Sequence, residues 1–143
     1  MGKFPQGGYL VIRATIDTHA IIWYIFADTR LSINARNFIE QIAADGEKIA
    51  LASITLAEII YLTEKGRLPA TTFECLLQAL DSNTSLLVEI PFNREIAQSL
   101  RLVERTQVPD LPDRIIAATS LHLGVPLISR DRKIQLSSIN TIW

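Results

Sequence analysis

Four acidic side chains stand at points where the sequence pattern changes from one expected element to the next. Asp17 and Asp131 each come at or just after the end of a short apolar run, and Glu58 and Asp113 lie in the first turns of two amphipathic segments. Carboxylates ~5 Å apart at an effective dielectric of ~20 repel each other by on the order of 3 kcal/mol per pair. If these four side chains meet, their charge therefore requires a cation.

The residue types restrict which cation this would be. Cys75 is the only cysteine, and His19 and His122 are the only histidines, so a Cys/His zinc site is excluded by counting. Carboxylate ligands select a hard divalent ion, Mg²⁺ or Mn²⁺. Such an ion in an open acidic pocket activates water and neutralises charge on a phosphate, which predicts phosphodiester hydrolysis.

Each acid also has a structural interpretation. Residues 55–58 have the spacing of a capping box, which alone would account for Glu58. Asp110 and Asp113 flank Pro112 at an expected helix start, where carboxylates satisfy free N–H groups, and Asp131 could be a turn residue. Asp17 is the hardest to explain in this way, because it interrupts an apolar stretch. Capping does not explain why four strand-edge positions should all be acidic.

Neighbouring polar residues are expected to support the site. Thr18 and Ser129 each adjoin a candidate ligand and could orient a metal-bound water or cap a helix, and Asp110 is placed in the same supporting group. Arg114 and Arg130 are candidates for binding substrate phosphates.

Other nearby residues have plainer interpretations. Arg132 and Lys133 fit a solvated helix face at least as well as a phosphate contact. His19 is expected to make a structural hydrogen bond, and His122 lies far along its helix. The aromatic side chains after His19 are expected in the core: Trp23, Tyr24 and Phe26.

Length and composition point to one compact domain. The chain has 143 residues, of which 48% are hydrophobic, and 14 basic against 15 acidic residues give a net charge of −1. No global positive field attracts nucleic acid, so any polyanion site must be local. The single cysteine fits a reducing cytoplasm, and no apolar run approaches the ~20 residues that span a membrane. Residues 1–12 are expected to form a flexible leader before a domain spanning residues 13–143.

Short apolar runs alternate with longer amphipathic segments, the pattern of an α/β fold in which helices cover a parallel sheet. The runs at residues 13–17, 49–52, 86–90 and 126–129 predict four strands, and residues 141–143 a possible fifth. Between them the spacing predicts helices at residues 18–26, after Ser32, at 55–65, around 73–80, at 93–107 and at 112–123.

Three segments resemble a known family. Residues 16–20 (Ile-Asp-Thr-His-Ala), 53–59 (Ser-Ile-Thr-Leu-Ala-Glu-Ile) and 113–131, from Asp-Arg-Ile-Ile-Ala-Ala-Thr to Leu-Ile-Ser-Arg-Asp, are similar to PIN domains, and more narrowly to VapC-like toxins of bacterial toxin–antitoxin pairs. The resemblance runs from about Ala14 to the C-terminus. One departure is that the family's frequent Asp-Pro-x-Asp-Arg stands here as Asp-Leu-Pro-Asp-Arg at residues 110–114.

The resemblance implies a three-layer α/β/α domain with a central, mostly parallel sheet of four or five strands. It also implies a Mg²⁺- or Mn²⁺-dependent endoribonuclease acting on an RNA substrate, a homodimer, and a cognate antitoxin that blocks the site. The family's acidic positions fall on Asp17, Glu58, Asp113 and Asp131.

Two other classes compete with this interpretation. A receiver-like signalling or interaction module would bind Mg²⁺ without hydrolysis, but it needs a phosphoacceptor Asp at a middle strand, and residues 49–52 contain none. A small-molecule phosphatase would require Asp-x-Asp at the first strand, where His19 occupies the second position.

Overall fold

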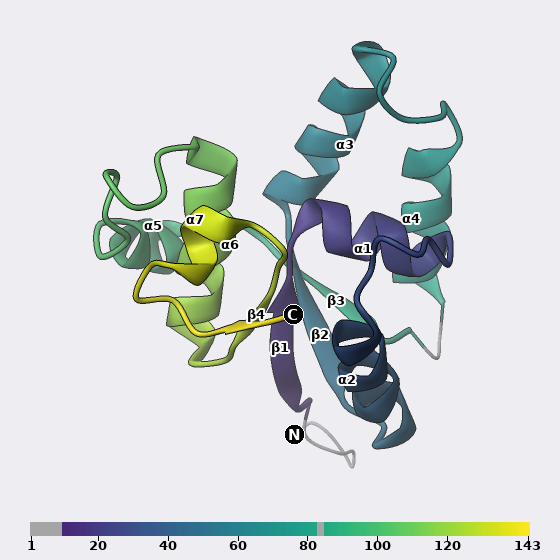
Figure 1. The fold of residues 1–143 in the computed structure, drawn as a ribbon, viewed down its shortest axis with the longest axis horizontal. Coiled ribbons are helices and arrows are strands. Elements are labelled where there is room, and N and C mark those ends of the chain that lie inside the picture. The colour runs from purple at the N-terminus through teal and green to yellow at the C-terminus, as the bar shows by residue number, and fades with distance from the viewer. Residues whose placement is uncertain (1–9, 83–84) are drawn as a thin grey trace.

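The central element is a single five-stranded sheet. The computed structural model describes residues 10–82 and 85–143. Its strands are β1 (Ile12–Ile16), β2 (Lys48–Ala52), β3 (Leu87–Ile90), β4 (Leu127–Ile128) and β5 (Thr141–Ile142). They lie in the order β3-β2-β1-β4-β5, and every neighbouring pair is parallel (Figure 1). The expected parallel α/β sheet is therefore confirmed.

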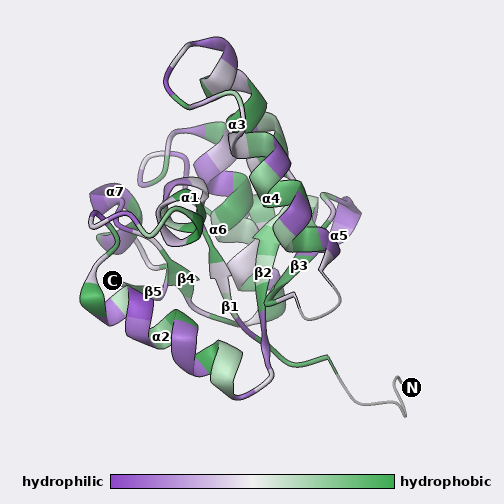
Figure 2. Cartoon of the chain, turned by 90° about the vertical axis from the view of Figure 1, so that its right-hand side faces the viewer, coloured by the Kyte–Doolittle hydropathy of each residue, from purple (hydrophilic) through white to green (hydrophobic). Residues whose placement is uncertain are grey.

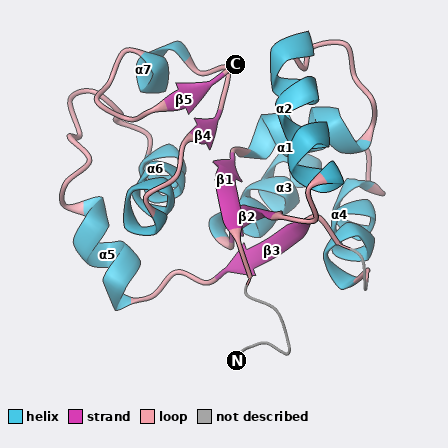
Figure 3. Ribbon diagram, turned by 90° about the horizontal axis from the view of Figure 1, so that it is seen from below, coloured by secondary structure: helices cyan, strands magenta, loops and turns pink. Residues whose placement is uncertain are grey.

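Helices cover both faces of this sheet. They are α1 (Thr18–Ile25), α2 (Ile33–Ala44), α3 (Ile54–Glu64), α4 (Thr72–Asp81), α5 (Arg94–Leu100), α6 (Leu111–Leu123) and α7 (Arg132–Gln135). The first four lie on one side of the sheet and the last three on the other, as seen from below in Figure 3. The three-layer arrangement is that predicted from the resemblance.

Side chains of the strands belong to two hydrophobic clusters, one under each helical layer. Ile128 packs with the cluster that contains side chains of α1 to α4, whereas its neighbour Leu127 packs with the cluster of α5, α6 and α7. Successive side chains of a strand point to opposite faces, and both are fully buried here. The outer helices are correspondingly two-sided, and Figure 2 shows polar and apolar bands on α2, where Ala35, Ile39 and Ile42 form the buried face.

The strand order creates a crevice beside β1. Within the sheet, β2 and then β3 follow next to one edge of β1. The chain then returns and adds β4 and β5 next to the other edge of β1. In open parallel sheets, ligands bind at the carboxyl ends of the strands where this order reverses. Asp17 follows β1 and Asp131 lies three residues after β4, so both acids stand at the switch point.

The start of β1 and the end of α5 differ from the sequence-based expectation. Strand β1 begins at Ile12, and the amide of Lys48 donates to the carbonyl of Val11, so the sheet starts inside the expected leader. The rest of that leader, residues 1–9, lies outside the described residues. The helix expected to reach residue 107 ends at Leu100, and beyond this end the Arg114 guanidinium donates to the carbonyls of Leu100 and Val103. No helix within the described ranges is long and apolar enough to cross a membrane.

Candidate active site

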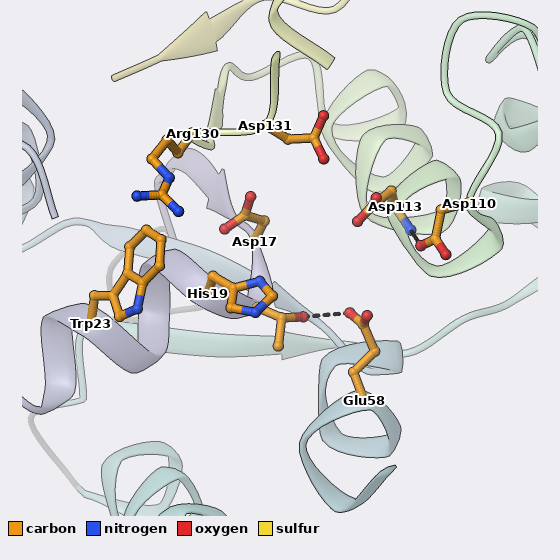
Figure 4. Close-up of a pocket in the computed structure, with 9 residues that line it drawn as sticks. Asp17, His19, Trp23, Glu58, Asp110, Asp113, Arg130 and Asp131 are labelled. Carbon is orange, nitrogen blue, oxygen red and sulfur yellow. Dashed lines mark hydrogen bonds between the residues drawn. The ribbon is translucent and has the colours of Figure 1, made fainter. Parts of the chain in front are cut away.

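Two of the predicted acids cap the helices that follow the switch-point strands. The carboxylate of Asp17 accepts a hydrogen bond from the Ala20 amide at 2.9 Å at the start of α1. Oδ1 of Asp131 accepts from the amides of Lys133 at 2.8 Å and Ile134 at 3.1 Å at the start of α7. Asp131 therefore lies in the connection between strand and helix, as the turn interpretation expected, and it also caps α7. Both side chains also face the same pocket (Figure 4).

Glu58 is held by a side chain from the first strand–helix junction. The hydroxyl of Thr18, which is buried, donates to Oε1 of Glu58 at 2.5 Å and lies 3.1 Å from the hydroxyl oxygen of Thr55. The capping-box interpretation of residues 55–58 is wrong. The N-cap residue of helix α3 is Ser53, so Thr55 lies inside the helix and cannot cap it. The Ser53 hydroxyl accepts from the Phe92 amide at 3.1 Å and makes no cap bond to the helix.

The remaining two acids come from the first turn of α6. Asp110 caps this helix, accepting from the amide of Asp113 at 3.1 Å, so the capping interpretation of Asp110 is confirmed. Asp113 is half-buried, and both carboxylates line the pocket that contains Asp17 and Glu58. The sheet and its helices therefore bring residues from four distant segments to one place.

The resulting pocket has a volume of about 360 Å³ (Figure 4). It contains all four predicted catalytic acids together with three of the expected supporting or substrate-binding residues, Thr18, Asp110 and Arg130. Ser129 lies behind it: its buried hydroxyl accepts from the Asp131 amide at 3.0 Å and hydrogen-bonds Asp17.

Three of the pocket acids have raised pKa values. Burial raises the pKa of Asp17, although hydrogen bonds from Ser129 and Ala20 oppose this effect. Burial likewise raises the pKa of Glu58, against the hydrogen bond from Thr18. The pKa of Asp113 rises to about 7 because of burial and then of repulsion from the other pocket acids, Asp110 foremost. Burial thus favours the protonated form of these acids, and for Asp113 repulsion from the neighbouring acids adds to this effect.

These donors fit a hard divalent cation in chemistry. Their ligating atoms are carboxylate oxygens, which Mg²⁺ and Mn²⁺ prefer. A bound cation would relieve the repulsion between these acids, which adds to the effect of burial on the pKa of Asp113. In the part of the chain that the structure describes, no three His, Cys, Asp or Glu side chains are already drawn together into a metal-binding group. Binding would therefore require these side chains to move closer together.

The two arginines expected to bind substrate have different surroundings. Arg114 lies away from the pocket: its Nη2 donates to the carbonyls of Leu100 at 3.1 Å and Val103 at 3.0 Å, which gives it a structural role. The expectation of phosphate binding by Arg114 is therefore not supported. Arg130 is exposed and lines the pocket.

Two pocket residues were not predicted to be functional. His19 and Trp23 line the pocket, with ring centroids 5.7 Å apart on the same face of α1. The available signal was that His19 and Trp23 are four residues apart, which places them on one helix face, and that His19 follows Asp17 by two residues. Trp23 is 4% exposed, which agrees with its expected core position, whereas Phe26 is 45% exposed and the core interpretation of that residue is wrong.

Fold and site together define a parallel α/β domain with a carboxylate-lined pocket at the switch point of its sheet. A family model, that of the PIN domain, matches residues 14–138. Because the match covers most of the chain, the protein belongs to the PIN domain family.

Three known proteins are similar to this chain. Ribonuclease VapC22 of Mycobacterium tuberculosis is 26% identical over 121 residues, covering 84% of this chain and 88% of the relative. The crystal structure of VapBC2 from Rickettsia felis, bound to a DNA fragment from their promoter, has a TM-score of 0.67 at 20% identity, with 92% of this chain and 97% of the other covered. A toxin–antitoxin complex from Klebsiella pneumoniae has a TM-score of 0.60 at 22% identity, covering 91% and 96%. These two structures support the fold.

Proposed function

We propose that this protein is a metal-dependent endoribonuclease that acts as the toxin of a type II toxin–antitoxin pair. The observation that carries the proposal is the convergence of Asp17, Glu58, Asp113 and Asp131 on one pocket at the switch point of the sheet. Membership of the PIN domain family and the similarity to a VapC ribonuclease support it.

The four acids would hold Mg²⁺ or Mn²⁺. Such an ion supplies Lewis-acid activation of water and neutralises charge that develops on the phosphate during in-line displacement. Thr18 fixes the carboxylate of Glu58, and Ser129 restrains Asp17 and the backbone of Asp131, so hydrogen bonds from neighbouring residues hold three of the four acids.

The RNA strand is proposed to cross the acidic pocket between basic residues. Arg130 lies on the lining of the pocket. A second hollow of about 290 Å³ shares Asp110, Asp113 and Asp131 with the pocket and is also lined by Arg132 and Lys133. Cations on both sides of the carboxylates can hold consecutive phosphates while the acids act on the bond between them. This arrangement favours a phosphate-binding role for Arg132 and Lys133 over a merely solvated face.

The proposal includes a cognate antitoxin, a homodimer and a cytoplasmic location. An antitoxin is supported by the toxin–antitoxin complexes among the similar structures. The homodimer follows from family resemblance, and the cytoplasm fits a chain with one cysteine. The PIN family match favours this nuclease over the receiver-like module considered from the sequence.

The proposed activity is tested by incubating the purified chain with RNA and added Mn²⁺, Mg²⁺ or EDTA. We expect cleavage with either metal and none with EDTA. Asp17→Asn should abolish cleavage and retain the fold, because an Asn side chain can still accept from the Ala20 amide. Full nuclease activity in Asp17→Asn would refute the assignment. Growth arrest on expression, relieved by the neighbouring open reading frame, would support the toxin role.

A further inference from the structure

Two arginines lie against the ring of the buried Trp23, and their surroundings differ. The guanidinium carbon of Arg130 is 4.4 Å from the ring centroid, and that of Arg30 is 5.2 Å away. Arg30 is paired with Asp28 through two hydrogen bonds, Nε to Oδ1 at 3.1 Å and Nη2 to Oδ2 at 2.7 Å. Arg130 makes no ion pair or hydrogen bond with any residue that the structure describes, so its N–H donors are available.

Trp23 is itself firmly placed. Its side chain belongs to the hydrophobic cluster under α1 to α4, and the ring of Trp143 meets it edge-on with centroids 6.0 Å apart. A cation over the face of an indole is attracted by the ring quadrupole, and Trp is the most effective residue for this contact. The ring therefore offers Arg130 a fixed surface at the border of the pocket (Figure 4).

Arg130 lies beside the pocket acids but is not paired with them. Asp17 and Asp131 line the same pocket as Arg130, yet the guanidinium forms an ion pair with neither within the described residues. Held against Trp23, the cation stays beside the carboxylates without neutralising them. A guanidinium over an aromatic face still presents N–H groups along its edges, which suit phosphate oxygens.

We propose that Trp23 is a positioning residue, whose ring holds the Arg130 guanidinium at the mouth of the acidic pocket to bind a phosphate oxygen of the RNA strand. This inference rests on the proposed function. Because the guanidinium is already placed, less side-chain freedom is lost when RNA binds. The contribution of Trp23 to substrate binding therefore acts through Arg130.

A double-mutant cycle on RNA cleavage tests this dependence. Arg130→Ala should raise KM by about tenfold, the loss of a charge-assisted hydrogen bond, with little change in kcat. Trp23→Leu should raise KM by about two- to fivefold in the wild-type background and have almost no effect when Arg130 is already Ala. Trp23→Phe, which keeps a ring in the core, should lie between wild type and Trp23→Leu.

Arg30 provides the matched control. It lies over the same ring but is not part of the pocket lining, so Arg30→Ala should leave KM unchanged. Circular dichroism and thermal melts establish that each variant is folded. KM effects of Trp23→Leu or Trp23→Phe that simply add to that of Arg130→Ala would overturn this inference and leave the proposed function standing. Absence of RNA cleavage by the wild-type protein would overturn both.

Discussion

The hydroxyl of Thr18 donates to the carboxylate of Glu58 across a distance of 2.5 Å, joining the first turn of α1 to α3. The two residues are 40 positions apart in the chain. This bond places the Glu58 carboxylate in the same pocket as Asp17, the residue before Thr18. The geometry of the acidic cluster thus depends on a buried hydroxyl as well as on the acids themselves.

Thr18→Val removes this donor while keeping the shape of the side chain. We expect the concentration of Mn²⁺ required for half-maximal cleavage to rise by about 10- to 100-fold, as is typical when a partner that orients a metal ligand is lost. Thr18→Ser keeps the hydroxyl and is the matched control. An unchanged Mn²⁺ requirement in a folded Thr18→Val protein would contradict this role.

The raised pKa of Asp113 predicts that the metal-free protein loses stability as pH rises. The pKa in the folded protein is about 7 against an ordinary value of 3.8, so the folded state binds this proton more tightly than the unfolded chain. The stabilising contribution is complete below the ordinary pKa and is lost as pH rises through about 7. The raised pKa values of Asp17 and Glu58 act in the same direction.

Thermal denaturation in EDTA at about pH 5 and about pH 8 measures this effect, with a lower Tm expected at the higher pH. Asp113→Asn should reduce the difference. Added Mn²⁺ should raise Tm more at about pH 8, where the carboxylates are ionised and available as ligands. An Asp113→Asn protein with the same pH dependence as wild type would show that Asp113 is not the titrating group.

Arg114→Ala is expected to affect stability and not substrate binding. Its guanidinium satisfies the carbonyls of Leu100 and Val103 where α5 ends, and hydrogen bonds from a charged group contribute about 1.5–3 kcal/mol. Urea denaturation should show a loss of this order in the free energy of unfolding, and KM for RNA should stay at the wild-type value. A raised KM with unchanged stability would return Arg114 to the substrate-binding residues.

Much of the fold could be predicted because local patterns agreed with it. Apolar runs at β1, β2 and β4 are buried on both faces, which leaves a strong signal in the sequence. The acids at the ends of these strands could be placed at one edge from the parallel topology alone. The early end of α5 could not be foreseen, and neither could the contact of Arg114, from the next helix, with the Leu100 carbonyl at that end.

The sequence could not predict which side chains pair across the fold, because these partners are far apart in the chain. Residues 55–58 have the sequence of a capping box, but helix α3 begins at Ile54, so Thr55 lies inside it and its hydroxyl meets that of Thr18 on another helix. Arg114 and Arg130 look alike in the sequence, each beside a pocket acid. Only the direction of each side chain distinguishes a helix-end contact from a pocket cation.

The central claim is that the four carboxylates form one divalent-metal site. Electron paramagnetic resonance during titration with Mn²⁺ at about pH 8 measures the free ion directly and does not depend on RNA or on turnover. We predict saturable Mn²⁺ binding by the wild-type protein, competed by Mg²⁺ and lost in Asp17→Asn. Binding that is absent from the folded wild-type protein, or that persists unchanged in Asp17→Asn, would contradict the claim.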